Sequence, residues 1–258
     1  MYNNVLSEQK GNVTYITINR PAQLNALNGE TISELNKAFN AANEDANCGV
    51  VILTGSGEKA FVAGADIKEF ANYMQEEGEK MAALGQDLLF NFVQNMSKPV
   101  IAAVNGFALG GGLELAMSAH IRVASVNAKL GLPEVSLGVI PGYGGTQRLA
   151  QLVGRGKAME MVCTAGMIGA QEAKEIGLVN HVVEIEELMP TAEKIASKIL
   201  NNSGSAIAAA IRAINANYED GVNGFETEIK QFGSCFGSKD FIEGTTAFVE
   251  KRKPNFRG

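Results

Sequence analysis

Two continuous apolar runs constrain the fold more than any other feature of this 258-residue chain. Val50–Leu53 and Val100–Val104 contain no polar residue, and glycine or asparagine follows each of them closely. Uninterrupted apolar runs of this length are typical of strands that are buried on both faces of a mainly parallel sheet. Stretches with helical spacing separate these runs, so strand and helix alternate along the first two-thirds of the chain. This alternation predicts an α/β fold.

The residues before these runs predict a hairpin and a helix. Asn4–Gln9 and Val13–Asn19 flank a turn at residues 10–12, which is the pattern of two antiparallel strands. From Thr31 to Ala42 the apolar residues recur at helical spacing, and Asn28 is a suitable N-cap for that helix.

The pattern changes near Asn201, after which only helices are expected. Three helical stretches follow, at residues 206–216, 224–236 and 241–251. Phe225, Ile229, Phe232 and Phe236 lie along one face of the second stretch. We therefore expect a core domain over residues 1–200 and a helical region over residues 201–258, with a weak boundary at residues 202–204.

Composition and charge exclude several classes of partner. The formal charge of −6 argues against nucleic acid or an acidic membrane, although a small anionic ligand needs only local positive groups. No apolar run approaches the ~18 residues of a membrane span, and the first residues lack the apolar stretch of a signal peptide. Cys48, Cys163 and Cys235 are odd in number and far apart, so we expect buried thiols in a reducing compartment. These features predict a cytoplasmic location.

Several common catalytic motifs do not occur in the sequence. The nucleophile elbow GxSxG, the zinc motif HExxH and the P-loop GxxxxGK[ST] are all missing. His120 and His181 are the only histidines, and we expect both to be structural or surface residues, with no metal site. Residues 142–147 contain GxG, but Gln147 departs from the dinucleotide fingerprint. The chemistry is therefore expected to use carboxylates and backbone groups.

Two turns of small residues follow the predicted strands. The first contains Ala63, Gly64 and Ala65 just before Asp66, and the second is Gly110–Gly112. Since a glycine costs a helix interior roughly 1 kcal/mol relative to alanine, three in a row suggest that another group approaches the backbone closely. Free N–H groups at a helix N-terminus bind developing negative charge, so two such turns could form an oxyanion hole. Tight packing explains the glycines equally well, and spacing alone does not show that the turns meet.

Two glutamates lie in apolar surroundings. Glu114 stands three residues after Gly111, so its carboxylate can reach a group bound at the mouth of the predicted helix. Glu134 lies in a second apolar segment. Buried carboxylates need a partner or a purpose, so one hypothesis is a general acid/base pair with shifted pKa values. A structural salt bridge with an arginine such as Arg148 is the more common explanation for either one.

Together these motifs resemble the crotonase, or enoyl-CoA hydratase, family, and the resemblance spans nearly the whole chain. The matching segments are residues 19–27, 60–67, 98–114, 133–149 and 243–256. The resemblance implies an α/β fold of the ClpP/crotonase-like class, a spiral of ββα units with a C-terminal helical trimerisation region. It also implies a homohexamer, assembled as a dimer of trimers, that acts on a coenzyme A thioester.

The resemblance also implies roles for individual residues. The oxyanion hole would be the backbone N–H groups of Ala65 and Gly111, the acid/base pair would be Glu114 and Glu134, and the Gly142 N–H would hold the catalytic water. The remaining contacts that it implies with the coenzyme A substrate are Ala63, Asp66, Ile67, Lys68, Phe232, Phe248 and Lys251. The last three would reach the ligand of a neighbouring subunit. No cofactor is implied, because coenzyme A is part of the substrate.

The activity implied is reversible syn addition of water to a trans-2-enoyl-CoA to give a (3S)-3-hydroxyacyl-CoA, in fatty acid β-oxidation or short-chain acyl-CoA metabolism. The nearest alternative in this superfamily, a double-bond isomerase, can use one carboxylate at Glu134, so the presence of Glu114 favours hydration. An RNA-binding relative would need a basic stripe, whereas Glu76, Glu77 and Glu79 make their segment acidic. Residues 72–86 are expected to shape the acyl pocket.

Overall fold

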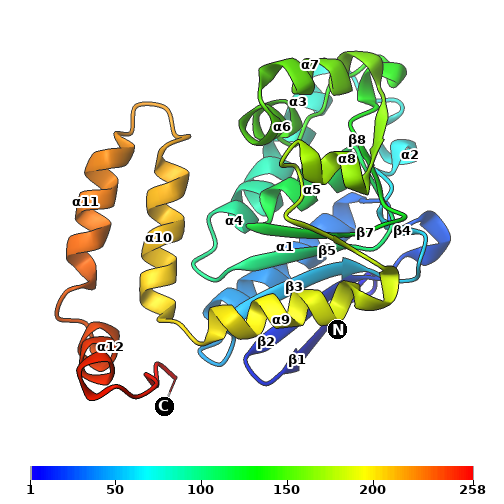
Figure 1. The fold of residues 1–258 in the computed structure, drawn as a ribbon. Coiled ribbons are helices and arrows are strands. Elements are labelled where there is room, and N and C mark those ends of the chain that lie inside the picture. Colours follow the sequence, from blue (N-terminus) through cyan, green and yellow to red (C-terminus); the bar gives the residue numbers. More distant parts are fainter. Residues whose placement is uncertain (1, 258) are drawn as a thin grey trace.

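The computed structural model describes residues 2–257 and shows two β-sheets with helices packed on and between them (Figure 1). The larger sheet has six strands in the order β1-β2-β3-β5-β7-β10. Their bounds are β1 Val5–Lys10, β2 Val13–Ile18, β3 Val50–Gly55, β5 Val100–Val104, β7 Ile121–Ser125 and β10 His181–Val183. The β1–β2 pair is antiparallel and the other pairs are parallel. The predicted hairpin and the mainly parallel sheet are thus confirmed.

The smaller sheet has four short strands in the order β4-β6-β8-β9. They are β4 Ala60–Val62, β6 Phe107–Leu109, β8 Lys129–Gly131 and β9 Met167–Gly169. Strands β4, β6 and β8 are parallel, and β9 joins them antiparallel. In each of the pairs β3–β4, β5–β6 and β7–β8 the first strand enters the large sheet, the second enters the small sheet, and helix follows. This is the repeated ββα arrangement expected from the sequence.

The helices that follow the strands match the predicted alternation. They are α1 Gly29–Glu44, α2 Ile67–Phe70, α3 Gln75–Gly85, α4 Asn91–Gln94, α5 Gly111–Ser118, α6 Gly145–Val153, α7 Arg155–Thr164, α8 Ala170–Glu175 and α9 Leu188–Leu200. Short 3-10 turns are η1 Pro21–Gln23, η3 Glu134–Leu137 and η4 Ile185–Glu187, and η2 Gln86–Phe90 is a π-helical segment between α3 and α4. The side chain of Asn28 caps α1 by accepting a hydrogen bond from Thr31 N–H at 2.8 Å, as predicted.

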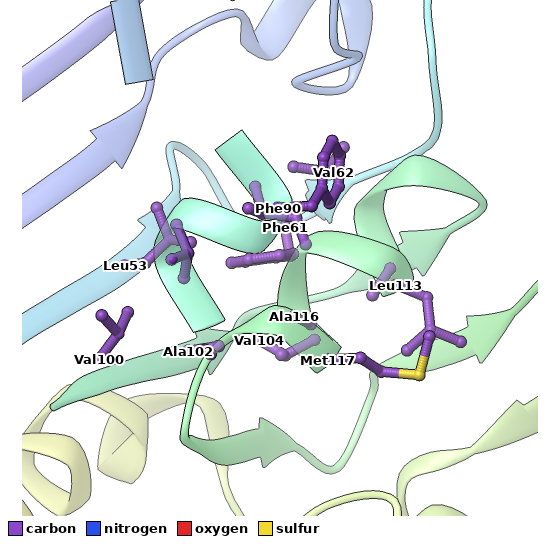
Figure 2. Packing of buried hydrophobic residues seen from close by; sticks show 14 of the residues in the cluster. Leu53, Phe61, Val62, Phe90, Val100, Ala102, Val104, Leu113, Ala116 and Met117 are labelled. Atoms are coloured by element: carbon purple, nitrogen blue, oxygen red, sulfur yellow. The ribbon is translucent and has the colours of Figure 1, made fainter. Parts of the chain in front are cut away.

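The large sheet is buried on both faces, which explains the uninterrupted apolar runs. Successive side chains of a strand point to opposite faces. Val51 and Leu53 of β3 therefore join the main core with α1 and α5, whereas Val50 and Ile52 pack under α9. Figure 2 shows the main core, where side chains of β3, β4 and β5 meet those of α5.

The C-terminal segment forms α10 (Gly204–Ala216), α11 (Gly224–Cys235) and α12 (Lys239–Glu250), so the three predicted helices are confirmed. They lie beside the rest of the chain as an arm (Figure 1). The apolar side chains of α11 and α12 remain exposed: Phe225 is 81% accessible and Phe248 86%. Large exposed apolar side chains thus gather on α11 and α12, whereas Ala247 of α12 is buried.

The cysteines only partly match expectation. Cys48 is buried and Cys235 half-buried, but Cys163 is exposed, so the prediction of buried thiols is wrong for Cys163. Its helix, α7, buries Ala158 and Met161, and Cys163 lies outside that buried stripe. His120 is half-buried, and its Nδ1 accepts a hydrogen bond from Val100 N–H at 2.9 Å, which fits the expected structural role. Within residues 2–257 no helix has the length and apolar character needed to cross a bilayer.

Candidate active site

Three neighbouring strands of the small sheet position the candidate site. Strands β4, β6 and β8 run parallel, so their carboxyl ends lie at the same edge of the sheet. Ala65, Gly111 and Glu134 each follow one of these ends within three residues. The Gly110 N–H donates to Gly131 O at 2.9 Å and ties the second turn to the third. The first and second turns also meet, because a Cβ on Gly64 would lie 3.7 Å from Leu109 O and one on Gly112 2.1 Å from Val62 O, a point that spacing alone left open.

The Ala65 turn is held by the segment that contains Leu27. Leu27 N–H donates to Gly64 O at 2.9 Å, and Asp66 N–H donates to Leu27 O at 2.7 Å. In this parallel bridge Gly64 and Asp66 bond to Leu27, so the N–H of Ala65, which lies between them, points away from Leu27. Gly111 is the first residue of α5, so its N–H has no acceptor within the helix. Within residues 2–257 no group accepts a hydrogen bond from either N–H.

The three successive glycines differ in how closely other atoms approach them. A Cβ on Gly112 would lie 2.1 Å from Val62 O, so this glycine lets α5 pack directly on β4. Gly110 has φ +51°, and a Cβ there would lie 2.8 Å from the Glu134 carboxylate. A Cβ on Gly111 would meet no atom closer than 3.6 Å. The packing explanation thus holds for Gly112, whereas the free donor lies on Gly111.

Glu114 is buried inside the site with its carboxylate fixed by backbone donors. It is 1% exposed, and its Oε1 accepts hydrogen bonds from Tyr143 N–H and Gly145 N–H, both at 2.8 Å. Burial raises the pKa of Glu114 to about 7; the two N–H donors and Arg148 oppose this rise, and Glu134 adds to it. Since Oε2 accepts no hydrogen bond within residues 2–257, this oxygen is available to a ligand.

Glu134 begins η3 and lies over Gly110. Its Oε2 is enclosed and has no hydrogen-bond partner within residues 2–257. Burial raises the pKa of this carboxyl above its ordinary value. An enclosed oxygen without a donor destabilises the carboxylate, so the site favours the protonated form of Glu134.

The alternative of a salt bridge with Arg148 is wrong. Neither Glu114 nor Glu134 forms an ion pair with any residue in the range 2–257. The Arg148 guanidinium instead donates to Gln94 Oε1 at 2.6 Å, Asn91 Oδ1 at 2.7 Å and Tyr143 O at 2.8 Å. Arg148 therefore supports the loop that holds Glu114 rather than Glu114 itself.

A cavity of about 970 Å³ joins these groups. Its lining includes seven of the predicted site residues: Ala63, Ala65, Ile67, Gly111, Glu114, Glu134 and Gly142. The expected wall at residues 72–86 is present, since α3 and the residues before it contribute Tyr73, Met74 and Met81 among others. No group of three or more His, Cys, Asp and Glu side chains that could hold a metal ion occurs among the described residues.

The other predicted site residues lie outside this cavity. Asp66 pairs with Arg20 at 3.3 Å, and Lys68 is exposed on α2. Phe232 and Phe248 belong to α11 and α12, and Lys251 follows α12 in a left-handed conformation. All three lie on the arm of C-terminal helices, away from the cavity of the same chain (Figure 1).

The sequence interpretation missed two parts of the site. The N–H groups of Tyr143 and Gly145 hold Glu114, although the glycines around Tyr143 were visible as a failed dinucleotide motif. The second is a hydrogen bond of Gln86, the last residue of the segment expected to shape the pocket: Gln86 lines the cavity and donates to Gly142 O at 2.7 Å. No pattern in the sequence identifies this contact, because it joins residues 56 positions apart.

The fold and the site define an α/β enzyme with two backbone donors and two carboxyl groups around one apolar cavity. The chain belongs to the enoyl-CoA hydratase/isomerase family, whose model matches residues 8–258. It is 51% identical to the short-chain-enoyl-CoA hydratase of Clostridium acetobutylicum, over 97% of this chain and 96% of that protein. It is 48% identical to the crotonyl-CoA hydratase of Syntrophomonas wolfei, over 99% and 98% of the two chains.

Solved structures agree with this family. The crystal structure of enoyl-CoA hydratase from Bacillus anthracis superposes with a TM-score of 0.92 at 42% identity, over 99% of this chain and 100% of that one. An enoyl-CoA hydratase structure from Geobacillus kaustophilus gives a TM-score of 0.94 at 32% identity, over 100% and 98%. The crotonase fold and the family expected from the sequence are confirmed, and the expected enzyme class, enoyl-CoA hydratase, is the class named for both relatives.

Proposed function

We propose that this chain adds water reversibly to short trans-2-enoyl-CoA thioesters, with Glu114 and Glu134 as the acid/base pair. The observation that carries this proposal is the convergence of two carboxyl groups with raised pKa values and two free backbone donors on one cavity. The short acyl chain is supported by the names of the two relatives, a short-chain-enoyl-CoA hydratase and a crotonyl-CoA hydratase.

The N–H groups of Ala65 and Gly111 bind the thioester oxygen in this proposal. The thioester conjugates the alkene to a carbonyl, so attack at C3 builds negative charge on that oxygen. Donors that already point at this oxygen stabilise the transition state most strongly. In comparable sites the loss of one such donor raises the activation free energy by about 3–4 kcal/mol. The backbone bridge at Leu27 and the close packing allowed by Gly112 fix the two donors in place.

The two carboxyl groups then divide the proton transfers. Ionised Glu114 takes a proton from water through its free Oε2 as the water oxygen bonds to C3. Protonated Glu134 delivers a proton to C2, and the enclosed Oε2 of Glu134 supports that protonated state. Gly142 N–H orients the water beside Glu114. Both carboxyl groups line one cavity, and the syn addition and the (3S) product are those that the family resemblance implies.

The same geometry favours hydration over double-bond isomerisation. An isomerase needs one carboxylate to move a proton along the acyl chain, and Glu134 alone could do this. Glu114 is instead fully buried, with two backbone N–H groups on one oxygen and the other oxygen free. Burying a second carboxylate in this way destabilises the fold through desolvation. A reaction that uses one carboxylate does not require this second group.

The remaining contacts form a route for coenzyme A and an interface between subunits. Ala63 and residues 65–68 would contact the coenzyme A portion, with Lys68 exposed at the outer end. The exposed apolar face of α11 and α12 supports a trimer-based homohexamer, in which residues 201–258 act as the association region. In that assembly Phe232, Phe248 and Lys251 would reach the ligand of a neighbouring subunit. The free thiols support a reducing, cytoplasmic location.

A hydration assay tests the proposal directly. Purified protein is incubated with trans-2-enoyl-CoA substrates from crotonyl- to hexadecenoyl-CoA, and loss of the conjugated enoyl-thioester absorbance is followed. We expect the highest kcat/KM for the shortest substrates. Conversion of 3-enoyl-CoA to 2-enoyl-CoA without hydration would instead establish the isomerase.

A further inference from the structure

One peptide group beside Glu114 is hydrogen-bonded at both of its ends. The peptide joins Gly142 to Tyr143. Its N–H, on Tyr143, donates to Glu114 Oε1 at 2.8 Å, and its carbonyl, on Gly142, accepts from Gln86 Nε2 at 2.7 Å. Gln86 and Glu114 are thus connected through a single planar unit, in which a rotation that breaks one bond also breaks the other.

The loop that carries this peptide needs an external support. Glycine stands on both sides of Tyr143, and Gly144 has φ +92°, so the backbone itself restricts the peptide little. Arg148 supports the next carbonyl, that of Tyr143, at 2.8 Å. Gln86 is the side chain that supports the Gly142 carbonyl. A donor on the carbonyl also polarises the amide and strengthens the hydrogen bond that its N–H makes.

The helix around Gln86 is shaped for this contact. Gln86 begins the π-helical segment η2, where the Asn91 N–H bonds to Gln86 O, and π-turns are often found at functional sites. A Cβ on the preceding residue, Gly85, would lie 2.3 Å from the Tyr143 ring, so only glycine allows the helix to approach the loop this closely. The Tyr143 ring stacks on Phe90 of the same segment with centroids 4.6 Å apart.

We propose that Gln86 is a positioning residue for hydration, which acts through the Gly142–Tyr143 peptide to orient the carboxylate of Glu114. The proposal rests on the role of Glu114 proposed above. The proposal also gives η2 a specific role. The preceding helix, α3, forms a wall of the cavity, whereas Gln86 at the start of η2 holds the loop that positions Glu114.

The charges around Glu114 determine the direction of the effect. Glu134 faces it from η3, Arg148 from α6, and the Tyr143 side chain from the loop. The Tyr143 N–H lowers the pKa of Glu114 against the effect of burial. Loss of the Gln86 donor weakens that N–H bond, so ionised Glu114 should be populated only at higher pH. The acidic limb of the kcat profile for hydration should move upward.

The test uses Gln86→Met, which keeps a side chain of similar length without the amide, in the full-length protein. Gln171→Met is the matched control, because Gln171 lies exposed on α8 and donates to Glu175 at 3.2 Å. For Gln86→Met with crotonyl-CoA we expect kcat to fall about tenfold, from the loss of roughly one hydrogen bond. KM should change less than about twofold, and the acidic limb should shift up by roughly 0.5–1 pH unit. Gln171→Met should match the wild type.

A double mutant and an amide resonance make the result decisive. In a Glu114→Gln background, Gln86→Met should have little further effect on kcat, because the two residues act as one unit. Independently of turnover, the Tyr143 amide proton resonance should titrate with Glu114, and its midpoint should rise in Gln86→Met. An unchanged acidic limb and an unchanged midpoint in a folded variant would overturn the proposal. If the wild type fails to hydrate any enoyl-CoA, the proposed function is wrong, and the amide titration still decides the Gln86 link.

Discussion

Replacing Gly112 by alanine tests whether the contact between α5 and β4 determines both stability and catalysis. The new Cβ would lie 2.1 Å from Val62 O and 2.7 Å from Val62 Cβ. Atoms in van der Waals contact need about 3.5 Å, so α5 must move away from β4 by roughly 1 Å. Overpacking of this kind costs about 1–3 kcal/mol, which corresponds to about 2–10 °C in Tm for a chain of this size.

The same displacement should impair catalysis, because α5 carries both the Gly111 N–H and Glu114. A misplacement of roughly 1 Å can cost about 10²-fold in rate. Thermal unfolding and initial rates of crotonyl-CoA hydration measure the two effects. Gly111→Ala is the control for stability, since its Cβ would meet Leu27 and Tyr143 only at an ordinary 3.6 Å. If Gly112→Ala has the Tm and the hydration rate of the wild type, the close-packing argument is refuted.

The remaining predictions concern the carboxyl pair and the C-terminal arm. Glu114→Gln and Glu134→Gln should each lower the hydration kcat by about 10²–10⁴-fold with little change in thioester affinity; wild-type hydration by Glu114→Gln would support the one-carboxylate reaction. The pKa of Glu114 is raised from 4.5 to about 7, so the folded state binds more protons than the unfolded state between these values, and stability falls as pH rises through this window. Denaturant unfolding should therefore show Glu114→Gln to be more stable than the wild type at pH 8 by up to about 3 kcal/mol, with no difference near pH 4; equal stability at pH 8 would contradict the raised pKa. Light scattering should report several times the 27.3 kDa chain mass, and Phe232→Ser with Phe248→Ser should reduce it; an active wild-type monomer would disprove the interface.

The parts of the fold that the sequence predicts are those whose burial pattern is local. β3 and β5 are buried on both faces, so every residue in each run is apolar, and α1 shows a single buried stripe with an Asn28 cap. β4, β6 and β8 could not be recognised in this way. Each has only three residues, too few for a period to develop, and β4 and β6 run directly into small-residue turns.

The candidate site was predictable in its residue types but not in its contacts. Carboxylates in apolar segments and glycine turns indicated the kind of chemistry, and the family resemblance indicated Glu114 and Glu134. Only the structure shows that Gly112 is required for close packing whereas Gly111 is not. That difference depends on the position of Val62, which belongs to the preceding ββα unit. The donors at Tyr143 and Gly145 escaped prediction because their acceptor, Glu114, lies about 30 residues earlier in the chain, at |i−j| of 29 and 31.

The alternation of the chain between its two sheets has a consequence for how the site comes into existence during folding. Ala65, Gly111 and Glu134 follow adjacent strands that lie about 4.8 Å apart, yet 46 residues separate the first two along the chain and 23 the last two. Contacts of such high sequence separation form late, after the entropy of closing the intervening loops has been overcome. Until residues 142–145 have been synthesised and docked, Glu114 has no donors and gains nothing from burial. A chain that ends before residue 142 therefore lacks the two N–H donors that hold the Glu114 carboxylate.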